Sequence, residues 1–261
     1  MILNEYQLNA DLGYQQTLIY DRTFGFVTWA NASFEVPKVR SGFGLSYRNI
    51  QDEQGMYQDN QARFNYAFRF HIKKHTIVPA IYVGLVSHTR HSTMYGSIHG
   101  ETIDVGLGLN YRFKDLLFGI SMSRLNTPVI EGVYASPIIF NPRLNLILRY
   151  DWKIGKMFRI MPLTIFTWSD GFIQIDDFIV LGVDSISKVL ERVNLGIGYS
   201  LHASESQQGP SPVTIVLAPE FIFKWFRIGY TLDWEISTKT GFSVMRSHQI
   251  TLRMHLFRTD S

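Results

Sequence analysis

Three histidines in one short segment are the first residues in this sequence whose spacing could support chemistry. His88, His91 and His99 lie in a stretch rich in serine, threonine and glycine. Imidazole nitrogens bind Zn²⁺ and other transition metals, but this spacing matches no familiar metal site. The composition of the stretch is typical of a loop in water. We therefore predict solvated loop histidines, with no metal ion and no cofactor.

Two adjacent pairs could do acid–base or nucleophilic chemistry. Asp176 and Asp177 are neighbouring carboxylates, and Ser247 directly precedes His248. In a β-strand, adjacent side chains point to opposite faces, so neither pair can share one substrate. No third partner for the serine–histidine pair can be named from the sequence. These pairs give no reason to predict an enzyme, and we expect no catalytic residues.

Three other features exclude further classes of protein. Gly106 and Gly108 have no third glycine at the position that a dinucleotide-binding loop requires. The sequence contains no cysteine, which rules out disulfides, thiolate metal sites and cysteine catalysis. The net charge of +3 is spread along the chain, whereas nucleic-acid-binding proteins cluster their basic residues. We expect no nucleic-acid partner.

Composition and run length add a second constraint. Of the 261 residues, 46% are hydrophobic and only 18% are charged, while a soluble domain has about 25% charged residues. No stretch approaches the roughly 18 consecutive apolar residues of a membrane-spanning helix. Transmembrane helices are therefore excluded, but a membrane location is not.

An alternation of apolar and polar residues with a period of two runs through the chain. In residues 143–154, leucine, tyrosine and tryptophan alternate mostly with arginine, asparagine, aspartate and lysine. Successive side chains of a strand point to opposite faces, so one face is apolar and the other is mostly charged. The alternation is clear in segments 62–72, 102–112, 143–154, 192–202, 227–236 and 249–257. It is weaker in segments 8–19, 24–36, 41–50, 76–87, 116–125, 159–168, 172–183 and 213–223.

The connections between these predicted strands alternate between short and long from the second strand onward. The short turns are 37–40, 73–75, 113–114, 155–156 and 224–225, and the long polar loops are 51–61, 88–101, 126–140, 203–212 and 237–248. Two connections, 169–171 and 185–191, break the rule. A soluble sandwich gives no reason for this alternation, whereas outer-membrane barrels have short periplasmic turns and longer external loops. We predict a single domain over residues 1–261, an all-β, antiparallel up-and-down transmembrane β-barrel of about 14 strands in the outer membrane.

Three prolines lie inside predicted strands. Proline has no N–H to donate to a neighbouring strand, so it is confined to edges, strand starts and bulges. Pro79, Pro162 and Pro219 therefore predict bulges or shifted strand boundaries. The strand ends at these positions are left open by the sequence.

A barrel assigns different roles to the two faces of its wall. The charges on the inward face would be prohibitive in the dry core of a sandwich, but a wet or salt-bridged lumen accommodates them. Two interpretations stay open: a structural lumen of ion pairs, and an anion path or docking surface for an acidic segment. The predicted lumen charge network consists of Arg48, Arg63, Arg69, Asp104, Arg112, Arg143, Arg149, Asp151, Arg192, Asp233, Glu235 and Arg253. The predicted aromatic girdle at the membrane interface consists of Tyr111, Trp152, Tyr199 and Trp234.

The first residues bear on export. Residues 1–6 contain Asn4 and Glu5 and no apolar segment of a signal peptide. A barrel protein of the outer membrane must be exported. We therefore expect that the signal peptide has been removed or lies upstream of this start.

Several segments are similar to one known family. Residues 36–55 (VPKVRSGFGLSYRNIQDEQG) combine a proline turn, a glycine-alternating strand and an acidic loop that ends in glycine. Residues 104–128 (DVGLGLNYRFKDLLFGISMSRLNTP) give two such strands, and residues 159–166 (RIMPLTIF) place a proline in a strand. Near the C-terminus, a tyrosine-containing strand (GYTLDWEIS) and a loop precede Ser-His at the entry to the last strand. In order and over nearly the whole chain, these segments resemble the PorP/SprF family of type IX secretion system membrane proteins of Bacteroidota.

The resemblance implies a function that the residues alone do not indicate. It implies a non-enzymatic outer-membrane barrel that supports secretion or surface attachment of adhesin-type cargo, with gliding motility among the processes served. The implied partners are the lipid bilayer, other type IX secretion components and secreted cargo proteins, which are reached through external loops and periplasmic contacts. The alternative function is a transport barrel for small hydrophobic or anionic solutes.

Overall fold

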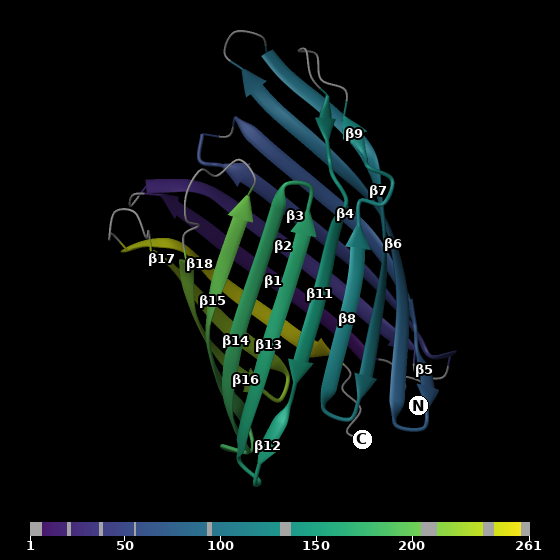
Figure 1. Ribbon diagram of the computed structural model, residues 1–261, viewed down its shortest axis with the longest axis vertical. Coiled ribbons are helices and arrows are strands. Elements are labelled where there is room, and N and C mark those ends of the chain that lie inside the picture. The colour runs from purple at the N-terminus through teal and green to yellow at the C-terminus, as the bar shows by residue number, and fades with distance from the viewer. Residues whose placement is uncertain are drawn as a thin grey trace.

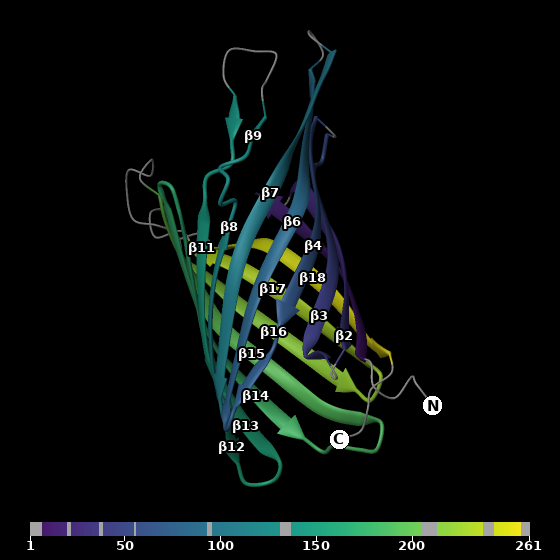
Figure 2. The same ribbon diagram turned by 90° about the vertical axis from the view of Figure 1, so that its right-hand side faces the viewer.

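A computed structural model describes residues 7–19, 22–36, 39–54, 56–92, 96–130, 137–204, 213–236 and 243–256 of the chain. In these residues the protein consists of β-strands joined by turns and short loops (Figures 1 and 2). No helix among them is long and apolar enough to cross a membrane.

Sixteen of the strands pair into one antiparallel sheet. The N-terminal half contributes β1 (Gln7–Ile19), β2 (Arg22–Val36), β3 (Ser41–Asp52), β4 (Tyr57–Phe68), β5 (Phe70–Ile72), β6 (His75–Ser92), β7 (Gly96–Phe113) and β8 (Leu116–Ser123). The C-terminal half contributes β11 (Arg143–Tyr150), β12 (Trp152–Ile154), β13 (Phe158–Ser169), β14 (Phe172–Asp184), β15 (Leu190–Ser204), β16 (Val213–Phe223), β17 (Phe226–Ile236) and β18 (Ser243–Leu256). A separate hairpin consists of β9 (Val129–Ile130) and β10 (Ile138–Ile139).

The large sheet closes on itself. Strands that follow one another in the chain pair around the wall, β1 pairs with β18, and β11 pairs with both β8 and β13. Strands β4 and β5 are one wall strand interrupted at Arg69, and β11 and β12 are one wall strand interrupted at Asp151. Counted in this way, the described wall has 14 strands, which confirms the predicted all-β, antiparallel up-and-down barrel.

The three prolines inside strands explain where the pairing is interrupted. Pro79 of β6 lies opposite the break between β4 and β5, and Pro162 of β13 lies opposite the break between β11 and β12. Beside Pro219 of β16, the pairing with β17 skips from Leu217 to Glu220. Each proline stays paired with its other neighbour. The missing N–H thus shifts the strand boundaries beside Pro79 and Pro162, as predicted, and beside Pro219 it interrupts only the pairing with β17.

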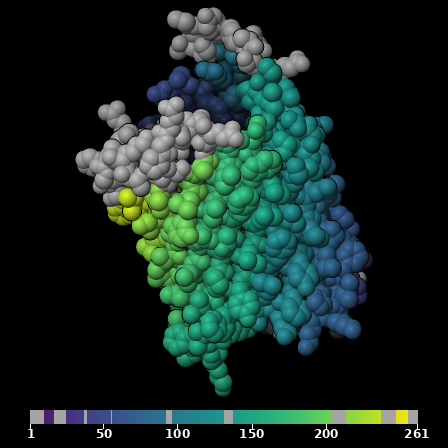
Figure 3. All heavy atoms as spheres, in the orientation of Figure 1, coloured from purple at the N-terminus to yellow at the C-terminus, as the bar shows by residue number. Residues whose placement is uncertain are grey.

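The strand register sorts the alternating residues onto the two faces of the wall. Leu45, Phe64 and Val83 are paired across β3, β4 and β6, and all three side chains are exposed. Arg63 and Asp104 belong to the opposite face; Arg63 lines a cavity inside the barrel, and Asp104 is fully buried. Large exposed apolar side chains far outnumber buried ones in the described residues. The wall therefore presents its apolar side chains outward, to lipid. In the view of Figure 3, side chains from successive strands cover the outside of the wall without a gap between them.

Two of the predicted loops are strands in the structure, so that part of the prediction is wrong. Strands β3 and β4 reach Asp52 and Tyr57, and strands β6 and β7 reach Ser92 and Gly96. The residues predicted as loops 51–61 and 88–101 are therefore mostly paired, as hairpins that continue past the apolar part of the wall. Predicted loop 126–140 contains the β9–β10 hairpin. Predicted loop 203–212 falls largely outside the described residues, as do residues 237–242 of predicted loop 237–248, whereas residues 243–248 are strand in β18, so that part of the prediction is wrong.

The two ends of the barrel differ. The connections just named lie at one end, the long-loop end, where β9 rises beyond β8 and β11 (Figures 1 and 2). Tight turns occupy the short-turn end, where β1 begins and β18 ends. Several of these turns contain a residue with positive φ, namely Arg40, Lys73, Lys114, Gly155 and Ser185. The turn at residues 170–171 is short although it lies at the long-loop end, as predicted.

A glycine in β6 gives the first testable prediction. A Cβ on Gly84 would lie 2.5 Å from the backbone oxygen of Ala62 and 2.7 Å from the Cγ of Arg63. We expect Gly84→Ala to destabilise the barrel by about 1–3 kcal/mol, because backbone in the adjacent strand must move. The urea midpoint of unfolding, followed by heat-modifiable electrophoretic mobility, measures this loss.

Gly42 provides the matched control. It also lies on the inward face, but the nearest atom to its added Cβ is 3.9 Å away. Gly42→Ala should leave the midpoint unchanged or raise it slightly, because alanine restricts the unfolded chain. Equal midpoints for the two variants would contradict the close approach of β4 and β6 at Gly84.

Candidate functional site

The register places the predicted lumen charge network on the face opposite the apolar side chains. Its most buried member is Asp104 of β7, with no exposed surface. The Asp104 carboxylate accepts hydrogen bonds from Arg63 Nη2 at 2.8 Å, from Tyr82 Oη at 3.0 Å and from the Arg124 backbone N–H at 3.1 Å. The Arg63 guanidinium also lies 4.6 Å from the centre of the Tyr82 ring. Asp104 therefore joins β4, β6, β7 and the segment after β8 from inside the barrel.

A second group of charges lies at the short-turn end. Arg159 donates hydrogen bonds to Asp151 and Asp184, and Arg192 donates to Asp184. Asp151 and Arg192 belong to the predicted network, whereas Arg159 and Asp184 were not predicted. The missed residues lie on the inward face of β13 and β14, whose alternation is weak in the sequence. The four side chains link the ends of β12, β13, β14 and β15.

Two further predicted arginines pair with carboxylates that the sequence reasoning missed. Arg253 of β18 bonds Asp11 of β1, across the seam between the last and the first strand. Arg69 bonds Glu35 of β2. Both carboxylates lie at inward positions of their strands, and this position is the signal that could have identified them. The alternation of these strands is weak, so the signal was missed.

The remaining members of the predicted network are not brought into one cluster. Arg112 donates to the backbone oxygen of Lys114 at 3.2 Å, close to a tight turn. Arg149 is exposed near the end of β11. Asp233 accepts a hydrogen bond from Ser247, and Glu235 lies opposite Thr214 in the pairing of β17 with β16. Arg48 and Arg143 lie elsewhere; they line a cavity described next.

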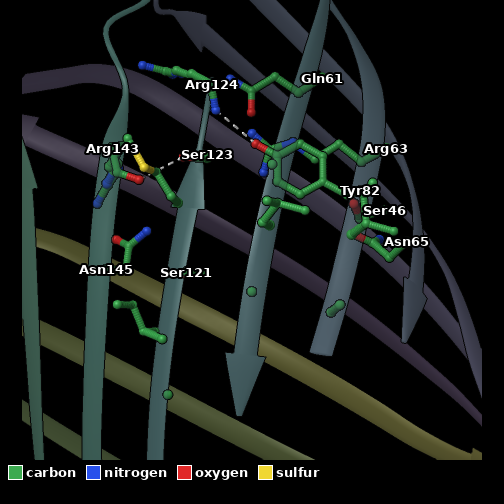
Figure 4. Close-up of a pocket in the computed structure, with 18 of the residues that line it drawn as sticks. Ser46, Gln61, Arg63, Asn65, Tyr82, Ser121, Ser123, Arg124, Arg143 and Asn145 are labelled. Atoms are coloured by element: carbon green, nitrogen blue, oxygen red, sulfur yellow. Dashed lines mark hydrogen bonds between the residues drawn. The ribbon is translucent and has the colours of Figure 1, made fainter. Parts of the chain in front are cut away.

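A cavity of about 580 Å³ lies in the lumen between β2, β3, β4, β6, β7, β8 and β11 (Figure 4). Four arginines line it, namely Arg48, Arg63, Arg124 and Arg143, and no aspartate or glutamate does. The neutral polar lining side chains include Ser46, Gln61, Asn65, Tyr82, Ser121, Ser123 and Asn145. The cavity is thus cationic and rich in hydrogen-bond donors.

The residues predicted as an aromatic girdle all have outward parity in the register. Trp152 and Trp234 are exposed. The Tyr111 hydroxyl lies 2.7 Å from His75 Nδ1, close to a short turn. The Tyr199 hydroxyl donates to Asp177 at 2.7 Å. Trp152, Trp234 and Tyr111 therefore present aromatic surface outward. Tyr199 does so too, and its hydroxyl is also a hydrogen-bond donor to Asp177.

Asp177 is an unexpected residue on the outer face. It lies between Ile175 and Ile179 on β14, and it accepts hydrogen bonds from Thr164 at 2.6 Å and from Tyr199 at 2.7 Å. Its neighbour Asp176 lies on the other face and bonds Gln174. The prediction that these two carboxylates point apart is therefore confirmed. A carboxylate in an outward apolar row is costly in lipid, and the two hydroxyls offset part of that cost.

Beyond the apolar part of the wall, the strands form what we call the external extension: residues 57–60, 87–92 and 96–101 with the β9–β10 hairpin. A small apolar core holds it together, in which Ile130, Ile138 and Phe140 pack on Val86. The Ile130 side chain fits against Gly100, where a Cβ would lie 2.1 Å from its Cγ2. The hairpin is therefore packed on the inner side of β6 and β7.

The prediction that His88 is a solvated loop residue is wrong. His88 is only 5% exposed, and its Nδ1 lies 2.7 Å from Asp59 Oδ1. The Tyr57 hydroxyl bonds the same carboxylate, and its ring lies edge-on to that of His88. Burial and the Asp59 carboxylate raise the pKa of Tyr57, which lies in this extension, outside the membrane-spanning segments. His88 is buried because β6 continues as a strand beside β4, whose Tyr57 and Asp59 side chains pack against the imidazole.

The other candidate histidines keep separate contacts. His91 and His99 are exposed and lie near Ser97 and Thr89 respectively. Within the described residues, no three histidine, aspartate or glutamate side chains come together in a way that could hold a metal ion.

The buried position of Asp104 leads to a prediction. Asp104→Ala leaves the Arg63 guanidinium without its paired carboxylate, and it should destabilise the barrel by about 3–5 kcal/mol. Asp11→Ala removes a carboxylate from the more exposed pair with Arg253 and should cost only about 0–1 kcal/mol. Unfolding midpoints in urea compare the two variants. Similar losses would contradict the special role of Asp104.

Comparison with solved structures places the fold among outer-membrane barrels. The chain is similar to the CymD monoaromatic hydrocarbon channel, with a TM-score of 0.57 and 10% identity over 98% of this chain and 89% of CymD. It is similar to the toluene transporter TbuX of Ralstonia pickettii, with a TM-score of 0.54 and 10% identity over 96% and 89% of the two chains. It also resembles CdiB of Acinetobacter baumannii, with a TM-score of 0.50 and 7% identity, over 97% of this chain and only 60% of CdiB. At these identities the likeness shows the fold alone.

Comparison of the sequence with known proteins gives one family. No curated protein matches the sequence. The family model described as "Type IX secretion system membrane protein PorP/SprF" matches residues 15–254, which is nearly the whole chain. The chain therefore belongs to the PorP/SprF family of type IX secretion system membrane proteins.

Proposed function

We propose that this protein is a non-enzymatic, outer-membrane component of the type IX secretion system, and that its external extension receives adhesin-type cargo for secretion or surface attachment. Family membership supports the secretion system, and the barrel fold supports the location. The observation that carries the role of the extension is an unpaired strand edge on β7.

The outward side chains of the extension support its position in water. Along β6 the outward residues change from Val83 and Leu85 to Ser87 and Thr89, and on β7 Glu101 follows Ile103 in the same way. Polar side chains are expected beyond the apolar band of a membrane barrel. The extension therefore stands on the side of the longer loops, which we assign to the cell exterior.

The unpaired edge of β7 begins where β8 ends. Strand β8 pairs with β7 only up to Leu107. Past this point, the Asn126 side chain accepts from the Val105 N–H at 3.2 Å and donates to the Ile103 oxygen at 2.7 Å. These contacts show that the backbone groups of Ile103 and Val105 point toward the β8 side of the strand.

Backbone groups of a strand alternate between its two sides. The N–H and C=O groups of Ser97, His99 and Glu101 therefore point to the same side as those of Ile103, and no other described strand pairs with β7 there. An open edge of this kind recruits an additional strand from a partner. We infer that an extended segment of the cargo pairs with this edge as an additional strand.

Apolar side chains of the β9–β10 hairpin support the same role. Val129 and Ile139 are opposite each other in this hairpin, and both are exposed. Apolar side chains exposed together on a part of the protein that lies in water mark a contact surface.

The short-turn end supports contact with other secretion components. Val39, Trp225 and Val189 are exposed in or beside its turns. We assign this end to the periplasm, where the family's other components are expected to meet it.

The edge is tested by removing a single N–H. His99→Pro takes away one donor at the open side of β7 and leaves its pairing with β6 in place. We expect secretion or attachment of the cognate cargo to fall by roughly tenfold or more, because the lost hydrogen bond leaves an acceptor of the cargo unpaired. A tenfold loss corresponds to about 1.4 kcal/mol of binding free energy. Quantitative immunoblotting of secreted and surface-bound cargo measures it.

His99→Ala is the matched control, because it also loses the imidazole contacts with Thr89 and Glu101 but keeps the backbone N–H. It should secrete like the wild type. Heat-modifiable mobility shows that both variants are folded. Normal secretion by a folded His99→Pro barrel would rule out strand addition at this edge.

A further inference from the structure

The cationic lumen cavity contains charges that the secretion function does not use. It is separated from the open edge of β7, and its arginines come from strands on different parts of the wall: β3 for Arg48, β4 for Arg63 and β11 for Arg143. Arg124 joins them from the segment that follows β8 (Figure 4).

Two of the four arginines are held by contacts within the protein. Arg63 is paired with Asp104, and Arg124 donates its backbone N–H to the same carboxylate. The Arg124 guanidinium lies 5.1 Å from the centre of the Phe140 ring. These contacts fix the position of one side of the cavity.

The other two arginines have no carboxylate partner in the described part of the chain. No ion pair joins Arg48 or Arg143 to an acidic side chain there, and the Nε atoms of Arg143 and Arg63 are buried without a hydrogen-bond partner. A buried, unsatisfied donor on a charged group is costly. These donors therefore call for an acceptor that the wall does not supply.

The electrostatics give the same result. Arg48 is within electrostatic reach of Arg143, Arg63 and Arg124, all of the same sign. The acidic groups that act on the pair are already engaged: Asp59 by Tyr57 and His88, and Asp176 by Gln174. Like charges held together by rigid strands destabilise each other unless an anion lies between them.

The excess of positive charge belongs to this cavity and not to the whole lumen. A second lumen cavity, of about 610 Å³, lies along β14 to β18 and is lined by Asp176, Glu220 and Asp233, with no lysine or arginine in its lining. The lumen therefore has a cationic side and an acidic side. Of these two cavities, the one lined by the four arginines favours an anion.

We propose that the cavity lined by Arg48, Arg63, Arg124 and Arg143 is a binding site for a small oxyanion, with a carboxylate or phosphate group held between the guanidinium groups of Arg48 and Arg143. Guanidinium groups match both kinds of oxyanion with paired hydrogen bonds. The Ser121 hydroxyl and the Asn145 amide nitrogen offer neutral donors beside Arg143 for the rest of the ligand, while the Ser123 hydroxyl donates to the Arg143 backbone oxygen. If the barrel transports anionic solutes, which is part of the alternative function, this site is where they would bind. The proposal does not depend on cargo binding at β7.

The test uses the purified, full-length barrel in detergent micelles. Sodium citrate and inorganic phosphate are titrated separately by isothermal calorimetry, with ionic strength held constant by sodium chloride. We expect saturable binding of at least one probe to the wild type, weakened about tenfold or more by Arg48→Gln and by Arg143→Gln, and abolished in the double variant. Arg112→Gln, which removes the same charge outside the cavity, should bind like the wild type.

Thermal unfolding keeps the proposal testable if a variant binds nothing. In chloride alone, Arg143→Gln should unfold at a higher temperature than the wild type, because one of the repelling charges is gone. Citrate or phosphate should raise the unfolding temperature of the wild type more than that of the variant. Absence of saturable binding of both probes to the wild type would overturn the proposal, as would equal weakening by Arg112→Gln. Cargo secretion is measured separately with His99 variants, so the two proposals fail independently.

Discussion

Backbone hydrogen bonding in lipid is the constraint on which this structure depends. Inside a bilayer every N–H and C=O group must find a partner within the protein, and a sheet achieves this only by closing. Here closure needs β1 to pair with β18 and β11 to pair with both β8 and β13. Proline is tolerated in such a wall where the neighbouring strand is interrupted, as beside Pro79 and Pro162, or where its pairing skips, as beside Pro219.

Closure also decides where each kind of side chain lies. Since the wall has lipid on one side and a narrow lumen on the other, the apolar residues that would form a core in a soluble protein are outside. The charges are enclosed instead, and they join strands from within: Asp104 serves three segments through Arg63, Tyr82 and Arg124. The wall is thereby rigid enough to hold like charges together at Arg48 and Arg143, and to support an extension that stands beyond the membrane.

The sequence predicted the parts of this structure that lipid dictates. Alternation with a period of two is strong where one face meets lipid, so the strand number, the closed topology and the prolines' effect on pairing were all accessible. Where strands leave the membrane both faces are polar, and the alternation disappears; residues 51–61 and 88–101 therefore looked like loops. The prediction for His88 was wrong for the same reason, since nothing in its own segment shows that β4 continues beside it and supplies Tyr57 and Asp59. Pairings such as Arg253 with Asp11 join distant parts of the chain, and parity alone cannot choose between partners on different strands.

The seam between β1 and β18 has a consequence for how the barrel is made. It pairs Leu8 with Leu256, so the first strand finds its second neighbour only when almost the entire chain is present. Until then the apolar faces of the other strands have no lipid around them and no closed wall to belong to, and contacts of such long sequence separation form slowly. Exposed apolar strands aggregate, so the route from synthesis to closure has to keep these side chains out of water. The finished wall is therefore one requirement on this sequence, and a path on which β1 and β18 can meet is another.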